Sequence, residues 1–232
     1  AWWCVCWTVF SRGAITKLVD RRTGRDYAPA GHRGYLVRVK AAGRELEPTS
    51  LRRGEETWSF SFEGGIELRV WVAASRGYIR FELDKAVRPG LIEAVLWGPF
   101  NTTISETIGE VVGVVRDRDF AIGIQALNTK TCGGKLVNDE GTTGGRTTAT
   151  KEEFGSSLQA FCVNQARDRV MTVWSAHKNV PVKALPGFKL EESALAIFGT
   201  APEAVLPLIG RIELAEGLPH PVLDGEWIKS SG

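Results

Sequence analysis

A chain of 232 residues is long enough for one large domain or two small ones. It can bury about 70–75% of the surface that its unfolded form would expose, so it needs no disulfide or metal to fold. The 29 Lys and Arg side chains nearly balance 27 Asp and Glu side chains, which argues against a dedicated nucleic-acid binder. No apolar run reaches the roughly 18–20 residues that span a bilayer, so we expect no membrane-spanning helix.

The chain has four cysteines: Cys4, Cys6, Cys132 and Cys162. Two thiols separated by one residue on a strand point to the same face, which disfavours a bond between Cys4 and Cys6. A bond from either of them to Cys132 or Cys162 and buried free thiols both stay open. The first residues lack the charged and apolar regions of a signal peptide. The compartment therefore stays open, with a secreted or periplasmic location favoured over the cytoplasm.

The first 83 residues carry the clearest strand patterns. Residues 2–10, 14–20 and 35–39 are predicted strands separated by turns. Three further runs alternate apolar and polar side chains, namely Thr57–Phe62, Ile66–Val72 and Tyr78–Leu83. Because glycine-bearing turns join these three runs, we predict an antiparallel meander with one face exposed to solvent.

The stretch from Leu96 to Thr131 combines aromatic residues, carboxylates and strand signals. It opens with Trp97-Gly98-Pro99-Phe100, which is typical of a backbone turn after a strand. Val111–Val115 and Phe120–Leu127 are predicted to pair around the charged turn that lies between them. Gly113 and Gly123 lie inside these runs, where glycine often marks a bulge or a close approach.

The last hundred residues contain a long polar loop, three more strand-like runs and one helix signal. Residues 132–150 form the loop, and a loop of that length inside a domain is usually functional or mobile. The strand-like runs are residues 161–163, 169–176 and 193–198. Thr200-Ala201-Pro202-Glu203 predicts a helix N-terminus with Thr200 as its cap. Pro207 would cost an interior turn roughly 3 kcal/mol, so the helix is expected to be short or kinked.

Together these patterns predict an all-β fold, a large antiparallel sandwich with one short C-terminal helix. We expect residues 1–215 to form this domain and residues 216–232, which carry Pro219 and Pro221, to form an extended connector leading to another domain.

Four carboxylates are candidates for acid–base chemistry. Glu106 and Glu110 would lie about 13 Å apart on a strand at ~3.3 Å per residue. That exceeds the roughly 5–5.5 Å of a retaining glycosidase pair and the roughly 6.5–9.5 Å of an inverting pair. Either one would therefore need a second carboxylate from the polar loop, where Asp139 and Glu140 are available.

Several side chains are candidates for binding a ligand. Trp71 lies on the polar side of its strand, and Trp97 adjoins the Gly98-Pro99 turn, so each either stacks on a ligand or packs inside the protein. Arg116 and Arg146 could hydrogen-bond hydroxyls or a carboxylate. His177 is the one histidine within a predicted strand region.

The motifs of other common sites are missing. No Gly-x-Ser-x-Gly elbow, phosphate loop or Cys-x-x-Cys pair occurs, and His32, His177 and His220 are widely spaced. We expect no transition-metal site and no cofactor. Asn138, Asp139 and Glu140 could ligate Ca²⁺, although their spacing is unlike that of an EF-hand.

Three phrases resemble the β-supersandwich domain that precedes the catalytic barrel of many bacterial glycoside hydrolases, a fold similar to galactose mutarotase. They are residues 14–24 (AITKLVDRRTG), residues 97–100 (WGPF) and residues 216–221 (EGLPHP) with Asp224-Gly225. The resemblance covers about residues 14–228. It implies a carbohydrate-related role in which the sandwich supplies a wall of the sugar pocket, while the acid and nucleophile come mainly from the barrel.

We therefore expect a carbohydrate-active protein that binds a poly- or oligosaccharide, with hydrolysis of glycosidic bonds left open. The acid would come from Glu106 or Glu110 and the second carboxylate from the polar loop. A catalytic barrel domain or a second copy of the chain is the expected protein partner. The alternative is a non-catalytic sandwich module for domain or subunit interaction.

Overall fold

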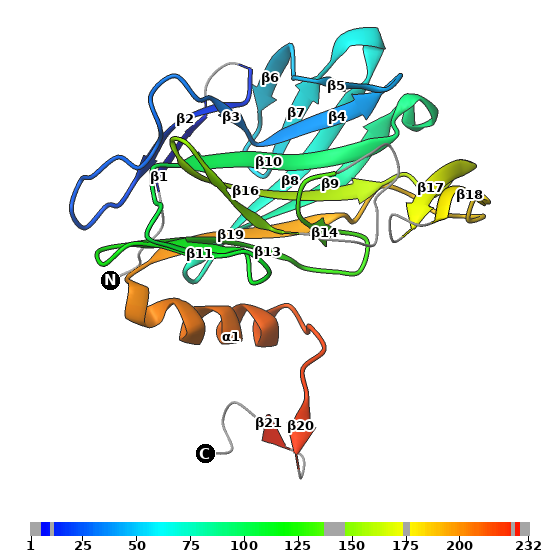
Figure 1. Ribbon diagram of the computed structural model, residues 1–232. Coiled ribbons are helices and arrows are strands. Elements are labelled where there is room, and N and C mark those ends of the chain that lie inside the picture. Colours follow the sequence, from blue (N-terminus) through cyan, green and yellow to red (C-terminus); the bar gives the residue numbers. More distant parts are fainter. Residues whose placement is uncertain (1–5, 10–11, 137–146, 174–176, 224–225, 228–232) are drawn as a thin grey trace.

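The computed structural model describes residues 6–9, 12–136, 147–173, 177–223 and 226–227. Over these residues the predicted all-β sandwich with one short C-terminal helix is confirmed. Two antiparallel sheets pack face to face, and the helix lies under the larger one (Figure 1).

The larger sheet has eight strands among the described residues, and every neighbouring pair is antiparallel. In spatial order they are β11 (Thr107–Gly109), β12 (Val114–Arg116), β13 (Ala121–Ala126), β19 (Ala194–Thr200), β9 (Tyr78–Val87), β8 (Glu67–Ser75), β7 (Thr57–Ser61) and β6 (Ser50–Arg53). The predicted meander is therefore β7–β8–β9, and the predicted pair around the charged turn is β12–β13.

The smaller sheet contains six strands in the part of the chain that the structure describes. Their order is β14 (Cys132–Gly133), β16 (Gly155–Val163), β10 (Ala94–Thr102), β4 (Val37–Ala41) and β5 (Arg44–Leu46), with β15 (Ala149–Glu152) pairing beside β14 on β16.

Shorter elements flank the sandwich. One three-stranded sheet holds β1 (Cys6–Val9), β2 (Ala14–Val19) and β3 (Gly34–Tyr35). Two hairpins are β17 (Arg169–Val173) with β18 (His177–Val182), and β20 (Val222–Leu223) with β21 (Glu226–Trp227). Three 3₁₀ turns cover Glu63–Gly65, Pro89–Leu91 and Pro202–Ala204. In Figure 1 the β17–β18 hairpin projects at one end, and β20–β21 lies beyond the helix.

The main hydrophobic core lies between the two sheets. The alternating side chains Phe60, Leu68 and Phe81 of the meander point into it, as their periodicity predicts. The outer face of strand β19 is also buried, because Ala196 and Phe198 pack against the helix. At Gly123 of β13 a methyl group would lie 2.3 Å from the ring of Phe198, which explains why glycine is needed there.

The helix α1 (Val205–Ala215) begins later than predicted. Thr200 is the last residue of β19 instead of a helix cap, and a 3₁₀ turn beginning at Pro202 precedes α1 with no capping side chain. Pro207 then falls in the first turn of α1, where its missing N–H has no partner to lose. The helix is short, as predicted, and the proline does not interrupt it.

Trp97 lies inside a strand and not at a turn after one. Strand β10 continues through Gly98 and Pro99, where a cis peptide bond and a bulge shift the register against β16. Gly98 has a φ of 92°, and a Cβ there would lie 2.8 Å from the carbonyl oxygen of Leu158. The bulge replaces the predicted turn, and Trp97 points into the core with 1% of its surface exposed.

A buried chain of hydrogen bonds joins the two sheets at Trp97. Its Nε1 donates to the hydroxyl of Ser193, at 3.0 Å. That hydroxyl lies 3.0 Å from the hydroxyl of Thr131, which accepts a hydrogen bond from the N–H of Ala194 at 2.9 Å. All four residues are buried, so each polar group depends on its protein partner.

The described cysteines carry free thiols. Cys162 is buried in the main core, and burial raises its pKa to about 11. Cys132 is half-buried on the neighbouring strand β14. Because Cys132 and Cys162 are free, neither forms the bond to Cys4 or Cys6 that the sequence left open. Cys4 and the side chain of Cys6 lie outside the described residues.

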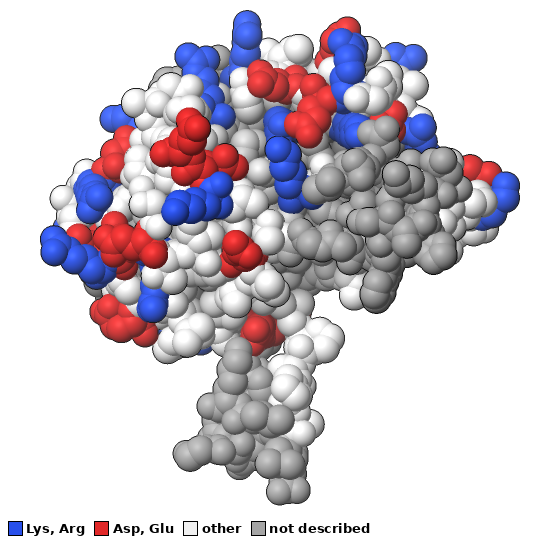
Figure 2. Space-filling model, in the orientation of Figure 1, with Lys and Arg blue, Asp and Glu red and all other residues white. Residues whose placement is uncertain are grey.

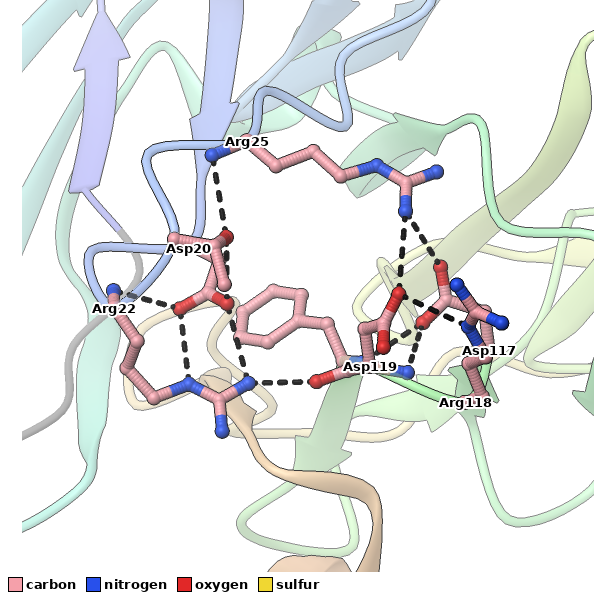
Figure 3. A network of polar contacts seen from close by, with 8 residues as sticks. Asp20, Arg22, Arg25, Asp117, Arg118 and Asp119 are labelled. Carbon is pink, nitrogen blue, oxygen red and sulfur yellow. Dashed lines mark hydrogen bonds and ion pairs between the residues drawn. The ribbon is translucent and has the colours of Figure 1, made fainter.

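A second polar network joins the turn that follows β2 to the β12–β13 turn (Figure 3). The carboxylate of Asp20 is 2% exposed and accepts two hydrogen bonds from the guanidinium of Arg22, each at 3.1 Å. Arg22 also donates to the carbonyl of Asp119 at 2.6 Å. In the turn itself, Asp117 accepts the N–H groups of Asp119 and Phe120. The network holds two segments together that are 97 residues apart in sequence.

We predict that Ser193→Ala lowers the free energy of unfolding by about 1–3 kcal/mol, because the indole N–H of Trp97 and the hydroxyl of Thr131 lose a buried partner. Denaturant unfolding monitored by tryptophan fluorescence measures this. The matched control is Ser105→Ala at an exposed serine, which should change stability by less than about 0.5 kcal/mol. Equal effects of the two variants would contradict the structural role given to the bridge.

Asp20 should also make stability depend on pH. Burial raises the pKa of this carboxyl, but hydrogen bonds from Arg22 and Thr23 outweigh burial and hold the pKa below its ordinary value of 3.8. A lowered folded-state pKa adds stability that is present above pH 3.8 and is lost as the pH falls through the folded-state pKa. We expect Asp20→Asn to cost about 1.5–3 kcal/mol at pH 7, and less in acid.

Unfolding curves for wild type and Asp20→Asn at pH 7 and in acid measure this difference. Asp168→Asn, at a carboxylate that is 61% exposed, is the control and should change stability far less at pH 7, because water screens an exposed ion pair. If the difference in the free energy of unfolding between wild type and Asp20→Asn is the same in acid as at pH 7, the pKa of Asp20 is not lowered by folding.

Candidate functional site

An open cavity of about 630 Å³, which we call the main cleft, lies at one end of β9. Four chain segments line it: residues 82–84 of β9, residues 89–90 of the 3₁₀ turn after β9, residues 164, 166 and 167 after β16, and residues 188–192 before β19. Its volume is within the range of about 300–1,000 Å³ that is typical of small-molecule sites.

The backbone fixes the walls of the main cleft. Segment 188–192 extends the pairing of β19 with β9, because Glu192 donates its N–H to Leu83 at 2.7 Å and Leu83 donates to the carbonyl of Ser193 at 2.9 Å. On the opposite wall, Asn164 donates its side-chain amide to the carbonyls of Pro89 and Ile92, at 3.0 and 2.8 Å. The main cleft is thus held by regular pairing on one side and by a buried amide on the other.

One residue of this wall has an unusual backbone conformation. Glu192 has a φ of 71°, in the left-handed region that costs non-glycine residues energy. The neighbouring groups hold it there: its carbonyl accepts a hydrogen bond from Asn128 at 2.5 Å, and its carboxylate lies 2.6 Å from the ammonium of Lys130. That ammonium also lowers the pKa of the Glu192 carboxyl.

Most carboxylates of the main cleft have a cationic partner. The pairs are Glu82 with Arg80, Asp84 with Arg69, and Glu192 with Lys130. Glu191 differs, because its Oε1 accepts the backbone N–H of Ala86 at 3.1 Å. A carboxylate accepts hydrogen bonds from hydroxyl groups, so these four side chains can bind a ligand that carries hydroxyls.

A cluster of polar side chains lies next to Glu82 of the main cleft, on the outer face of the larger sheet. Arg80 forms ion pairs with Glu82 and with Glu216, the residue that ends α1. Burial alone would lower the pKa of Arg80, but the two carboxylates outweigh burial and raise it. Tyr78 donates its hydroxyl to Glu216 at 2.6 Å, and burial together with this bond raises the pKa of Tyr78. This group fastens the end of the helix to the sheet.

Trp71 does not line the main cleft, but its strand neighbour Glu82 does. It stands opposite Glu82 in the β8–β9 pairing and is half-buried, with the guanidinium of Arg80 6.0 Å from its ring centroid. Trp97 is different, because a ring with 1% of its surface exposed has no face on which a sugar could stack.

The predicted carboxylates Glu106 and Glu110 lie elsewhere. They flank β11 on the edge hairpin of the larger sheet, and both are exposed. The chain between them is extended and not helical, which is the geometry in which they were not expected to work as a pair. Arg116 is exposed on the same hairpin, opposite Thr107. None of these three residues lines the main cleft.

The remaining predicted residues are not covered by the structure. Asp139, Glu140 and Arg146 lie outside the described residues, as does the side chain of His177, whose backbone starts β18. Their roles, including the Ca²⁺ site with Asn138, stay predictions. Within the described residues, no group of three or more His, Cys, Asp or Glu side chains is arranged to hold a metal ion.

The sequence analysis missed Glu82, Asp84, Glu191 and Glu192 as residues of one site. One feature of the sequence could have indicated them. Glu82 and Asp84 lie at the end of one predicted strand, and Glu191 and Glu192 lie just before another. Nothing in the sequence, however, shows that β9 and β19 are neighbours, because 106 residues lie between the end of β9 and the start of β19.

On the face drawn in Figure 2, basic and acidic side chains are interspersed over the described surface, as the near-zero net charge suggests. No helix in the described ranges has both the length and the apolar character needed to cross a membrane. Comparison with known proteins identifies no relative, because no protein-family model and no curated protein matches the chain.

Proposed function

We propose that the chain binds an oligo- or polysaccharide at the main cleft, with Trp71 at its rim. The observation that carries the proposal is the lining of the main cleft, where charged carboxylates and cationic groups surround an open cavity next to a half-exposed indole ring. Sugars offer many hydroxyl groups, which carboxylate and guanidinium groups can pair with, and an apolar ring face, which an aromatic side chain can cover.

The site supports binding better than hydrolysis. A glycosidase needs one protonated carboxylic acid to donate a proton to the leaving oxygen. Three carboxylates of the main cleft have cationic partners instead, and Lys130 lowers the pKa of Glu192. Hydrolysis would then need an acid from elsewhere, and the barrel domain of the resembling glycoside hydrolases is the source that we propose.

An interaction module is the second candidate function. Its support is three exposed apolar side chains near the C-terminal end of the described chain, Leu206 and Leu214 on α1 and Val222 on β20, at 69%, 53% and 58%. Such residues suit contact with another domain or subunit. This function does not require the main cleft to bind a sugar.

We predict that Glu191→Ala weakens saccharide binding at least about tenfold, equivalent to about 1.4 kcal/mol, because a charged acceptor inside the main cleft is lost. Glu191→Gln keeps an oxygen for the N–H of Ala86 and should weaken binding less. Affinity electrophoresis through glucan, galactan, mannan, xylan, pectate and alginate gels, followed by titration calorimetry, measures both.

Glu110→Ala is the matched control, since it removes an exposed carboxylate outside the main cleft. It should leave binding unchanged, and thermal unfolding should show all three variants folded. If Glu110→Ala weakens binding and Glu191→Ala does not, the site is on the β11–β12 hairpin. If wild type binds none of the polysaccharides, the proposed function is wrong and the interaction module becomes the better account.

A further inference from the structure

A second, smaller cavity lies next to the main cleft. It has a volume of about 220 Å³, and we call it the side cavity. Asn164 and Arg167 line both cavities, so the two spaces share part of a wall, formed by the short segment after β16. An oligosaccharide that passes over this shared segment would contact both cavities.

The side cavity is lined differently from the main cleft. Two arginines, Arg167 and Arg169, contribute to its wall together with the carboxylates of Glu93 and Asp168. Asp168 is already paired, because it lies 2.8 Å from the ammonium of Lys183 and accepts the N–H of Ala184 at 2.8 Å.

Glu93 is also engaged. Its Oε1 accepts the N–H of Gly43 at 3.1 Å and lies 3.9 Å from the guanidinium of Arg167. When the ammonium of Lys183 is counted with its partner Asp168, the charged groups of this region are three cations and two carboxylates. The local balance favours one additional negative charge.

Arg169 has unused hydrogen-bonding capacity. Its Nε and Nη1 atoms are buried and have no hydrogen-bond partner among the residues that the structure describes. Buried guanidinium nitrogens without a partner are costly, because the charge has lost water and gained nothing in exchange. Arg169 lines the side cavity, so an anionic group bound there would lie near this guanidinium and be attracted to its charge.

From this we infer that the side cavity is a subsite for a carboxylate-bearing sugar, so that the ligand is a uronate-containing oligosaccharide with its carboxylate beside Arg169. The inference rests on the proposed function, since it names the substrate class of the same site. A guanidinium suits this role because it stays charged at every relevant pH and its planar N–H groups match a carboxylate. The main cleft, with its larger share of carboxylates, then takes the neutral part of the chain.

The test compares matched ligands. Oligosaccharides that contain glucuronate, galacturonate or mannuronate are titrated into the protein by calorimetry, each beside its carboxyl-reduced form. We expect at least one acidic oligosaccharide to bind about tenfold more tightly than its reduced form, and we expect added salt to diminish that preference. Free glucuronate, galacturonate and mannuronate as monosaccharides should bind far more weakly, because they occupy the side cavity alone.

Variants assign the preference to a residue. Arg169→Gln should abolish the roughly tenfold preference for the acidic form, so that the acidic and reduced forms bind equally. The control Arg118→Gln removes an arginine whose side chain is 85% exposed, at the β12–β13 turn, and should have no effect. Circular dichroism of both variants confirms that the fold is intact.

The outcomes separate the two claims. Equal binding of acidic and reduced forms overturns this inference and leaves the proposed function standing. A preference that survives in Arg169→Gln overturns the assignment to the side cavity. If neither the acidic nor the reduced oligosaccharides bind, both the inference and the proposed function fail.

Discussion

The arrangement of this protein depends on a buried polar bridge between its two sheets. The indole of Trp97 in β10 donates to Ser193 at the start of β19, and the hydroxyl of Ser193 lies 3.0 Å from that of Thr131. A hydrophobic core sets which faces meet, but it tolerates sliding because apolar contacts have no direction. A buried hydrogen bond has a fixed geometry and is costly to leave unmade. The bridge therefore holds the smaller sheet in one position against the larger one.

The bridge also positions the candidate site. Ser193 directly follows the segment that forms one wall of the main cleft, and its carbonyl accepts the N–H of Leu83. On the other wall, Asn164 fixes the end of β16 against the turn after β9. Hydrogen bonds that join the two sheets therefore also hold both walls of the main cleft in place. A binding site built this way needs little ordering when a ligand arrives, which lowers the entropic cost of binding.

The sequence was sufficient for those features that depend on local pattern. Alternating side chains predicted β7, β8 and β9, and the apolar runs around Arg116 predicted the β12–β13 hairpin. The local pattern was insufficient where contacts between distant segments determine the structure. The phrase at Trp97 indicated a turn, yet the strand continues through a bulge because neighbouring strands pair on both sides of β10. Likewise, the carboxylates of the main cleft come from segments that only the sheet order brings together. The position of Trp71 on the polar face of β8 could be predicted because side-chain alternation along a strand is a local property.

The central claim is that the main cleft is where a saccharide binds. Amide hydrogen exchange, measured with and without the polysaccharide that retards the protein most on affinity gels, tests it most directly. Binding in the main cleft should slow exchange in residues 82–91 and 188–192 when the saccharide is present and leave residues 106–112 of the β11–β12 hairpin unchanged. Protection confined to that hairpin, or to α1, would show that the saccharide does not bind in the main cleft.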